Sequence, residues 1–120
     1  MGKNLTLTGM MGVGKSTIGK ILAKNLNYKF IDVDKLIEDK EGLSINFIFK
    51  NKSENYFRKI ENDITLTQLQ KDSSVIALGG GAFLNNLIRK NAKKLSTSFW
   101  LDVPLDALIK RLKKNRKRPL

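Results

Sequence analysis

The chain has 120 residues, which suits a single domain, and its hydrophobic content of 41% and charged content of 28% are ordinary for a globular protein. The absence of cysteine and histidine excludes disulfides, cysteine metal centres and histidine as a general base or metal ligand. The formal net charge of +12 is spread mostly as single lysines along predicted helices, and its one cluster, residues 110–118, has no aromatic residue for base stacking, so nucleic-acid binding is not expected.

The first predicted elements surround a glycine-rich loop. Residues 5–8 are typical of a short buried strand, and residues 17–26 of a helix, because Ile18, Leu22 and Leu26 recur at helical spacing. Between them, residues 9–16 read GMMGVGKS and match the phosphate-loop pattern G-x-x-x-x-G-K-[ST] at each fixed position. Such a loop points backbone N–H groups at a phosphate, with a helix N-terminus behind it. The segment therefore predicts an ATP site.

Individual residues of the loop have expected roles. Lys15 can reach the β- and γ-phosphates, and Ser16 can ligate Mg²⁺. A dinucleotide fingerprint is the competing interpretation, but Thr17 stands at its third glycine position and Lys15 has no role in it. The ATP-binding residues predicted in this region are Gly12, Val13, Gly14, Lys15, Ser16 and Thr17.

A second strand, residues 28–32, leads into two aspartates. Asp34 is predicted to open a helix that runs to about Lys40 and ends at Gly42. Asp32, at the strand end, can bind Mg²⁺ directly or through water. Asp34 faces another direction and can accept hydrogen bonds from substrate hydroxyls and a proton from the attacking one; the alternative is a plain helix N-cap.

Two further helices are predicted from their serine caps. Ser44 caps a short helix whose apolar side includes Phe49, and Ser53 caps a longer one with Phe57, Ile60, Ile64 and Leu69 near one face. On that longer helix, Arg58 is either an ordinary surface arginine or a clamp for a substrate carboxylate, since a guanidinium fork matches a carboxylate.

The remaining segments complete an alternating α/β pattern. Residues 74–78 form a third strand that runs into Gly79, Gly80 and Gly81, where close backbone approach to a ligand is expected. A helix over residues 85–94, a strand centred on residues 99–101 and a helix from Pro104 to about residue 114 follow. The pattern predicts a three-layer α/β/α fold with a mostly parallel sheet. Ligands bind at the carboxyl edge of such sheets, where the phosphate loop, the two aspartates and the triple glycine all lie.

Taken together, these motifs resemble the shikimate kinase family of P-loop kinases, with its nucleoside-monophosphate-kinase-like fold. The resemblance covers essentially the whole chain and rests on the order and spacing of its motifs. These are GMMGVGKST at residues 9–17, FIDVD at 30–34, Phe57-Arg58 with Glu61, LGGGA at 78–82, WLD at 100–102 and RPL at 118–120.

The resemblance implies Mg²⁺-dependent transfer of the ATP γ-phosphate to the 3-hydroxyl of shikimate, a step of aromatic amino-acid biosynthesis in the chorismate pathway. It implies that Asp34 is the base, that Arg58 binds the shikimate carboxylate, and that the three glycines lie along the substrate between apolar walls formed by Phe49 and Phe57. It also implies that Arg111 stacks on adenine and that Arg118 is a catalytic lid arginine that reaches the phosphates.

In the family the chain continues past the lid motif, and the resemblance therefore implies a single domain over residues 1–120 that lacks the last strand and has a lid beginning at about residues 111–120. A shortened chain of this kind is expected to be less stable or less active than a longer version. A cytoplasmic monomer that binds ATP and shikimate, with no membrane or signal segment, is the expectation. The alternatives left open are another small P-loop kinase, such as a gluconate kinase, and a nucleotide-binding module without turnover.

Overall fold

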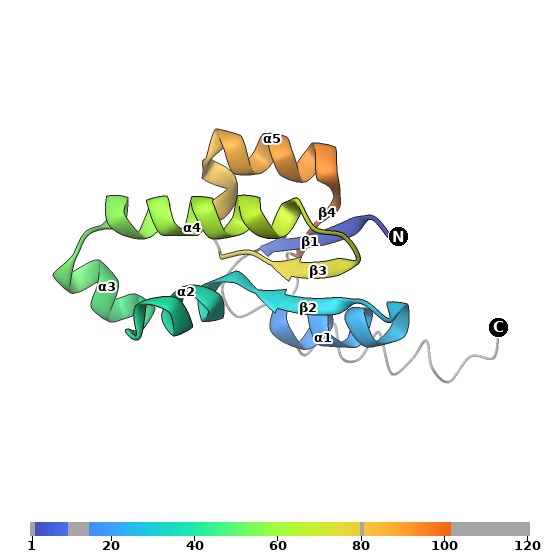
Figure 1. Ribbon diagram of the computed structural model, residues 1–120, viewed down its shortest axis with the longest axis horizontal. Helices are drawn as coiled ribbons and strands as arrows, with labels where there is room; N and C mark the ends of the chain where they lie inside the picture. The colour runs from blue at the N-terminus through green and yellow to red at the C-terminus, as the bar shows by residue number, and fades with distance from the viewer. Residues whose placement is uncertain (1, 10–14, 80, 102–120) are drawn as a thin grey trace.

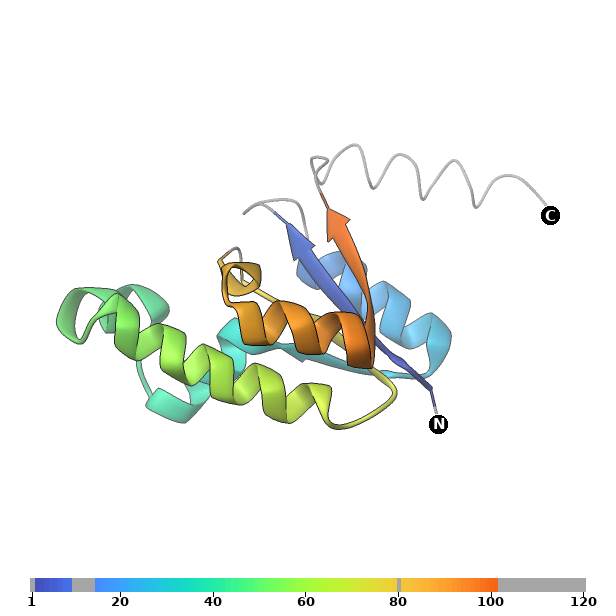
Figure 2. The same ribbon diagram turned by 90° about the horizontal axis from the view of Figure 1, so that it is seen from above.

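The computed structural model describes residues 2–9, 15–79 and 81–101, and these form three layers, with a sheet between helices (Figure 1). Helix α1 lies on one face of the sheet, and α4 and α5 lie together on the other, as Figure 2 shows from above. The strands are β1 (Asn4–Gly9), β2 (Lys29–Asp32), β3 (Ser74–Ala77) and β4 (Ser96–Leu101). The helices are α1 (Lys15–Leu26), α2 (Val33–Glu41), α3 (Ile45–Asn51), α4 (Glu54–Leu69), a short 3₁₀ turn η1 (Ala82–Leu84) and α5 (Asn86–Leu95).

The sheet of the described part has the strand order β2-β3-β1-β4, and every neighbouring pair is parallel. Parallel strands need long crossovers, which the intervening helices supply. The inner strand β3 is buried along its whole length. The predicted three-layer α/β/α fold is confirmed.

Alternate residues of the strands pack into two separate hydrophobic cores, one on each face of the sheet. Val75 and Leu7 pack with Ala23 of α1 on one face. Ile76, the next residue of β3, packs on the other face against the helices that carry Ile37, Ile88 and their buried neighbours. Because successive side chains of a strand point to opposite faces, a continuous apolar run such as SVIAL marks a strand that is covered on both sides.

Strand β4 is longer than its apolar centre suggests. It begins at Ser96, three residues before Phe99, and pairs with β1 along its whole length. The hydroxyl of Thr6 lies 3.1 Å from the hydroxyl of Ser96 and 2.8 Å from that of Ser98. These hydroxyl contacts satisfy polar groups at a place where hydrophobic patterning alone gives no sign of a strand.

Helix α2 begins one residue earlier than predicted, which corrects the N-cap assignment. The cap is Asp32, the last residue of β2, whose carboxylate accepts a hydrogen bond of 3.2 Å from the backbone N–H of Lys35. Asp34 lies inside the first turn, so the alternative that made it a plain N-cap is wrong, and its carboxylate is not engaged in capping. The predicted stop at Gly42 is confirmed, because Gly42 is left-handed with φ 66° and donates its N–H to Glu38.

Helices α3 and α4 begin at the predicted serine caps, Ser44 and Ser53. The fully buried residues of α4 recur every four positions and include a carboxylate; they are Phe57, Glu61, Thr65 and Leu69. Ile60 and Ile64, which the sequence places on that face, are partly buried against the same core. A charged side chain in this stripe is unexpected for a purely structural helix.

No helix in the described ranges is both long enough and apolar enough to span a bilayer. The helix predicted from Pro104 lies outside the described residues.

Candidate active site

The ends of three strands bring the predicted motifs together. In the sheet register Ala77 of β3 lies between Leu7 of β1 and Asp32 of β2. All three strands run in the same direction, so the segments that follow them leave the sheet at one edge. These segments carry Lys15, Asp34 and Gly79, which the sequence assigned to one crevice.

Lys15 is the first residue of α1. Its ammonium donates a hydrogen bond of 3.0 Å to the carbonyl of Gly9, at the end of β1. This contact holds the lysine beside the start of its own loop, where a phosphate would be bound. Of the predicted ATP-binding residues, Gly12, Val13 and Gly14 lie outside the described residues, and Thr17 is an exposed residue in the first turn of α1.

Ser16 and Asp32, the predicted metal ligands, are neighbours in space although they come from different elements. The Ser16 hydroxyl donates a hydrogen bond of 3.2 Å to Oδ2 of Asp32, while Oδ1 of Asp32 caps α2. Within the described ranges no group of three or more acidic side chains could hold a metal ion. Two oxygen donors nevertheless fit Mg²⁺, which is bound in kinase sites by one or two protein oxygens, phosphates and water.

Asp34 is half-buried in the first turn of α2, and its Oδ1 is shielded from solvent and has no hydrogen-bond partner among the residues that the structure describes. Burial raises the pKa of this carboxyl above its usual range, and the negative charge of Asp32 adds to the rise, whereas the ammonium of Lys15 opposes it. A carboxylate with a raised pKa and a free oxygen is suited to accept a proton from a substrate hydroxyl.

Glu61 is a site residue that sequence reasoning did not assign a role. It is 1% exposed, and burial raises its pKa against the opposing effect of Arg58. Within the described ranges its Oε2 has no hydrogen-bond partner. A β-carbon on Gly79 would lie 2.9 Å from Oδ1 of Asp34 and 3.3 Å from Oε2 of Glu61. Two carboxylate oxygens without described donors, one from α2 and one from α4, therefore face one glycine. The sequence signal for Glu61 is its position three residues after Arg58, a spacing at which two side chains of a helix can pair.

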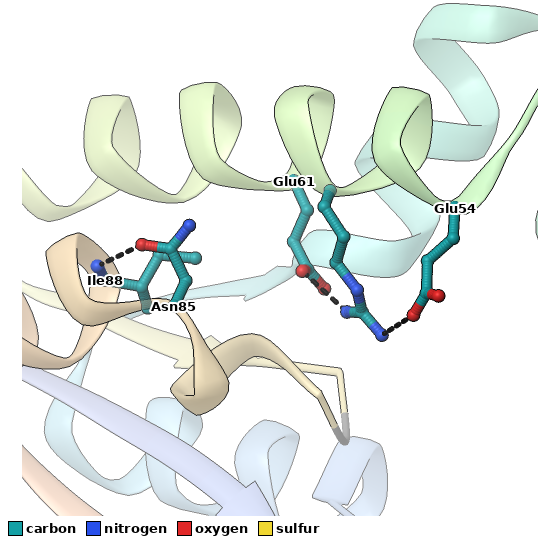
Figure 3. Close-up of polar contacts among 5 residues, drawn as sticks. Glu54, Glu61, Asn85 and Ile88 are labelled. Atoms are coloured by element: carbon teal, nitrogen blue, oxygen red, sulfur yellow. Dashed lines mark hydrogen bonds and ion pairs between the residues drawn. The ribbon is translucent and has the colours of Figure 1, made fainter.

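Arg58 lies between two glutamates of its own helix. Its Nη1 donates a hydrogen bond of 2.8 Å to Oε1 of Glu61, and its Nη2 lies 3.7 Å from Oε1 of Glu54, as the dashed lines in Figure 3 show. The guanidinium also lies against the backbone of Gly81, where a β-carbon would be only 2.8 Å from Cζ. The missing β-carbon of Gly81 thus leaves room for the guanidinium in its present position.

Phe49 and Phe57, the predicted apolar walls, pack against each other with ring centroids 4.8 Å apart. Phe57 is 3% exposed and Phe49 is 37% exposed. The Arg58 guanidinium lies 5.2 Å from the centroid of the Phe57 ring. The two rings thus connect the last turn of α3 to the first turn of α4, beside Arg58. The other predicted site residues, Gly80, Arg111 and Arg118, lie outside the described residues.

A parallel sheet, a phosphate-loop sequence after its first strand and carboxylates at the same edge define a P-loop kinase that acts on small molecules. A family model described as shikimate kinase matches residues 11–120. The chain belongs to the shikimate kinase family.

Individual relatives agree with this assignment. A shikimate kinase from Sulfurihydrogenibium sp. is 47% identical over 122 residues, which cover 98% of this chain and 71% of that protein. A solved shikimate kinase from Acinetobacter baumannii, in complex with shikimate, superposes with a TM-score of 0.83 at 33% identity, over 100% of this chain and 67% of that one. A gluconokinase from Sinorhizobium meliloti, at 16% identity and a TM-score of 0.56 over 98% of this chain and 67% of its own, shares the fold alone.

Proposed function

We propose that this chain transfers the γ-phosphate of ATP to the 3-hydroxyl of shikimate, with Asp34 as the base and Arg58 as the clamp for the substrate carboxylate. The observation that carries these roles is the pair of carboxylate oxygens, on Asp34 and Glu61, that face Gly79 and have no hydrogen-bond partner in the described part of the chain. Buried acceptors without donors are costly, so they favour a ligand that supplies hydroxyl donors at this point.

The acceptor half of the site suits a hydroxylated carboxylic acid. Arg58 is fixed by Glu61 and by the ring of Phe57, so the arginine is oriented before a substrate arrives. It offers a planar fork that can bind a carboxylate through two N–H groups. Asp34 and Glu61 can then accept hydrogen bonds from ring hydroxyls beyond that carboxylate. A neutral sugar has no carboxylate to bind to this fork.

Transfer proceeds by displacement at phosphorus. The 3-hydroxyl oxygen forms a bond to the γ-phosphorus, the bond from that phosphorus to the bridging oxygen of ADP breaks, and Asp34 takes the hydroxyl proton. The chain contains no histidine, so a carboxylate is the natural candidate for this proton. The raised pKa of Asp34 strengthens its carboxylate as a base.

The donor half of the site is assigned to the phosphate loop. Lys15 stabilises negative charge on the transferred phosphate, and Ser16 with Asp32 would hold Mg²⁺. When bound, Mg²⁺ neutralises charge on the β- and γ-phosphate oxygens. The adenine-stacking role of Arg111 and the lid role of Arg118 remain predictions, as do the monomeric state and the cytoplasmic location.

The proposal is tested by substrate preference. ADP release is measured with Mg²⁺-ATP and either shikimate or D-gluconate, beside the Arg58→Lys variant, which keeps the charge but loses the fork. We expect ADP release with shikimate but not with D-gluconate. In the Arg58→Lys variant we expect the KM for shikimate to rise at least about tenfold. Equal release with gluconate would favour a sugar-acid kinase, and ADP binding without turnover of either acid would favour a non-catalytic nucleotide-binding module.

A further inference from the structure

Arg58 has two carboxylate neighbours of different character. Glu61 is buried and close, with an N–O distance of 2.8 Å. The Glu54 side chain is 68% exposed, and its Oε1 stops 3.7 Å from Nη2, beyond the length of a proper hydrogen bond. Figure 3 labels the two glutamates on the same helix, and the Arg58 guanidinium lies within reach of both. The inner glutamate anchors the arginine, whereas the outer one is held only by a loose ion pair.

The outer edge of the guanidinium opens onto a cavity. This cavity, of about 280 Å³, is lined by Glu54, Asn55, Arg58, Gly81, Leu84 and Asn85. Asn85 uses its side-chain oxygen to cap α5, accepting hydrogen bonds from the N–H groups of Leu87 and Ile88. Among the described residues that line this cavity, Arg58 is the cationic group open to an anion, and the carboxylate that already approaches it is Glu54.

We propose that Glu54 acts as a built-in competitor for the Arg58 guanidinium and thereby lowers the affinity of the site for its carboxylate substrate. The inference rests on the proposed role of Arg58 as the substrate clamp. A substrate carboxylate that uses the outer N–H groups of the fork must displace Glu54 and then remain near its negative charge. The same glutamate returns to the guanidinium when the phosphorylated product leaves, since the product keeps its carboxylate. Glu54 is thus a positioning residue that acts through Arg58.

The size of the effect follows from the exposure of the pair. An exposed ion pair of this kind contributes only a small interaction free energy. Removing the charge of Glu54 is therefore expected to tighten shikimate binding by about two- to fivefold, the equivalent of about 0.4 to 1 kcal/mol. The gain shrinks as salt screens the charge, because the side chain is exposed to solvent.

The test compares Glu54→Gln with a matched control, Asp63→Asn, which removes the same charge from an exposed position of the same helix. Calorimetric titration with shikimate gives Kd, and steady-state assays give KM and kcat. We expect Kd and KM to fall by about two- to fivefold in E54Q while kcat changes less than KM, and no such fall in D63N. A Kd that is unchanged or raised in E54Q overturns the proposal; a raised Kd would mean that Glu54 accepts a hydrogen bond from the substrate.

The double variant separates this inference from the proposed function. If Arg58→Lys weakens shikimate binding and E54Q has no further effect in that background, Glu54 acts through the arginine as proposed. If Arg58→Lys weakens binding but E54Q alone does not tighten it, the competitor role fails and the clamp stands. If Arg58→Lys leaves Kd unchanged, the clamp itself is wrong and the competitor role falls with it. Thermal melts of each variant confirm that the chains compared are folded.

Discussion

Oδ1 of Asp34 lies 2.9 Å from the point that a β-carbon on Gly79 would occupy. The glycine therefore leaves an open space directly in front of the proposed base. Gly79→Ala would place a methyl group there, against two carboxylate side chains whose ends can shift. We expect a small loss of stability but a fall in kcat/KM for shikimate of about 10²-fold, because a displaced substrate no longer meets the base.

Gly42→Ala is the control for this substitution. Gly42 has a left-handed backbone, with φ 66°, and open space around its β-position. Alanine there should cost about 1 kcal/mol of stability, because the left-handed region penalises a β-carbon, yet leave turnover unchanged. Urea denaturation and the kinase assay together separate the two glycines. Equal kinetic effects would contradict the assigned role of Gly79.

Lys15→Ala should abolish most ATP-dependent turnover. In the proposed mechanism, the ammonium that now donates to Gly9 stabilises the transferred phosphate. We expect kcat to fall by about 10²-fold or more, since one preorganised charge at the developing transition state is worth that much. Lys24→Ala removes an equal charge from the last turn of α1 and serves as the control. A near-normal rate in K15A would refute the phosphate-loop assignment.

Asp32→Asn should separate metal binding from helix capping. Asparagine caps a helix as well as aspartate, so α2 and the melting temperature should be retained. The loss of charge beside Ser16 should raise the Mg²⁺ concentration for half-maximal rate by about tenfold. Titrating Mg²⁺ after removal of metal by a chelator measures this, with Asp72→Asn, beyond the other end of β3, as the control. An unchanged Mg²⁺ dependence would remove Asp32 from the metal site.

The pH dependence follows from the raised pKa of Asp34. If Asp34 is the base, as proposed, catalysis needs its ionised carboxylate, so kcat/KM should fall as pH drops through a value above the ordinary aspartate pKa of 3.8. Stability runs the other way: the folded state holds the proton more tightly, so the contribution of Asp34 is present below the ordinary pKa and is lost as pH rises through the raised one.

Asp34→Asn should therefore be at least as stable as the unsubstituted chain near neutral pH and should lose part of the pH slope. Glu61, whose pKa is also raised, keeps the remainder of that slope. Urea denaturation at a series of pH values checks both statements. A marked loss of stability in the variant at neutral pH would contradict this, because it would show that the Asp34 carboxylate stabilises the fold.

Much of the fold follows from local patterns in the sequence. The caps at Ser44 and Ser53 and the stop at Gly42 depend on short-range chemistry, and all three are confirmed. The predicted start of α2 was wrong by one residue, because aspartate is a good N-cap and the sequence offers one at both position 32 and position 34. The choice between them is made by β2, which carries Asp32 to the end of the sheet in an extended conformation.

The site was harder to foresee than the fold. Hydrophobic spacing marked Ile60 and Ile64 for the inner face of α4, but could not reveal that Glu61 is buried there, since burial of a carboxylate runs against the pattern. Its partner, Arg58, was identified as a clamp candidate from chemistry and resemblance. Contacts such as that between Ser16 and Asp32, 16 positions apart, are set by strand register and appear only in three dimensions. Departures from local rules of this kind are typical of functional sites.

The proposed reaction is tested by detecting shikimate 3-phosphate by mass spectrometry after incubation with shikimate and Mg²⁺-ATP. The assay compares the unsubstituted chain with Asp34→Asn, and the shikimate Kd of each is measured beside it. We expect product from the unsubstituted chain, formation slowed by about 10²- to 10⁴-fold in D34N, and Kd values that differ far less than the rates. Product formed equally fast by D34N, or phosphorylation of gluconate in place of shikimate, would contradict it.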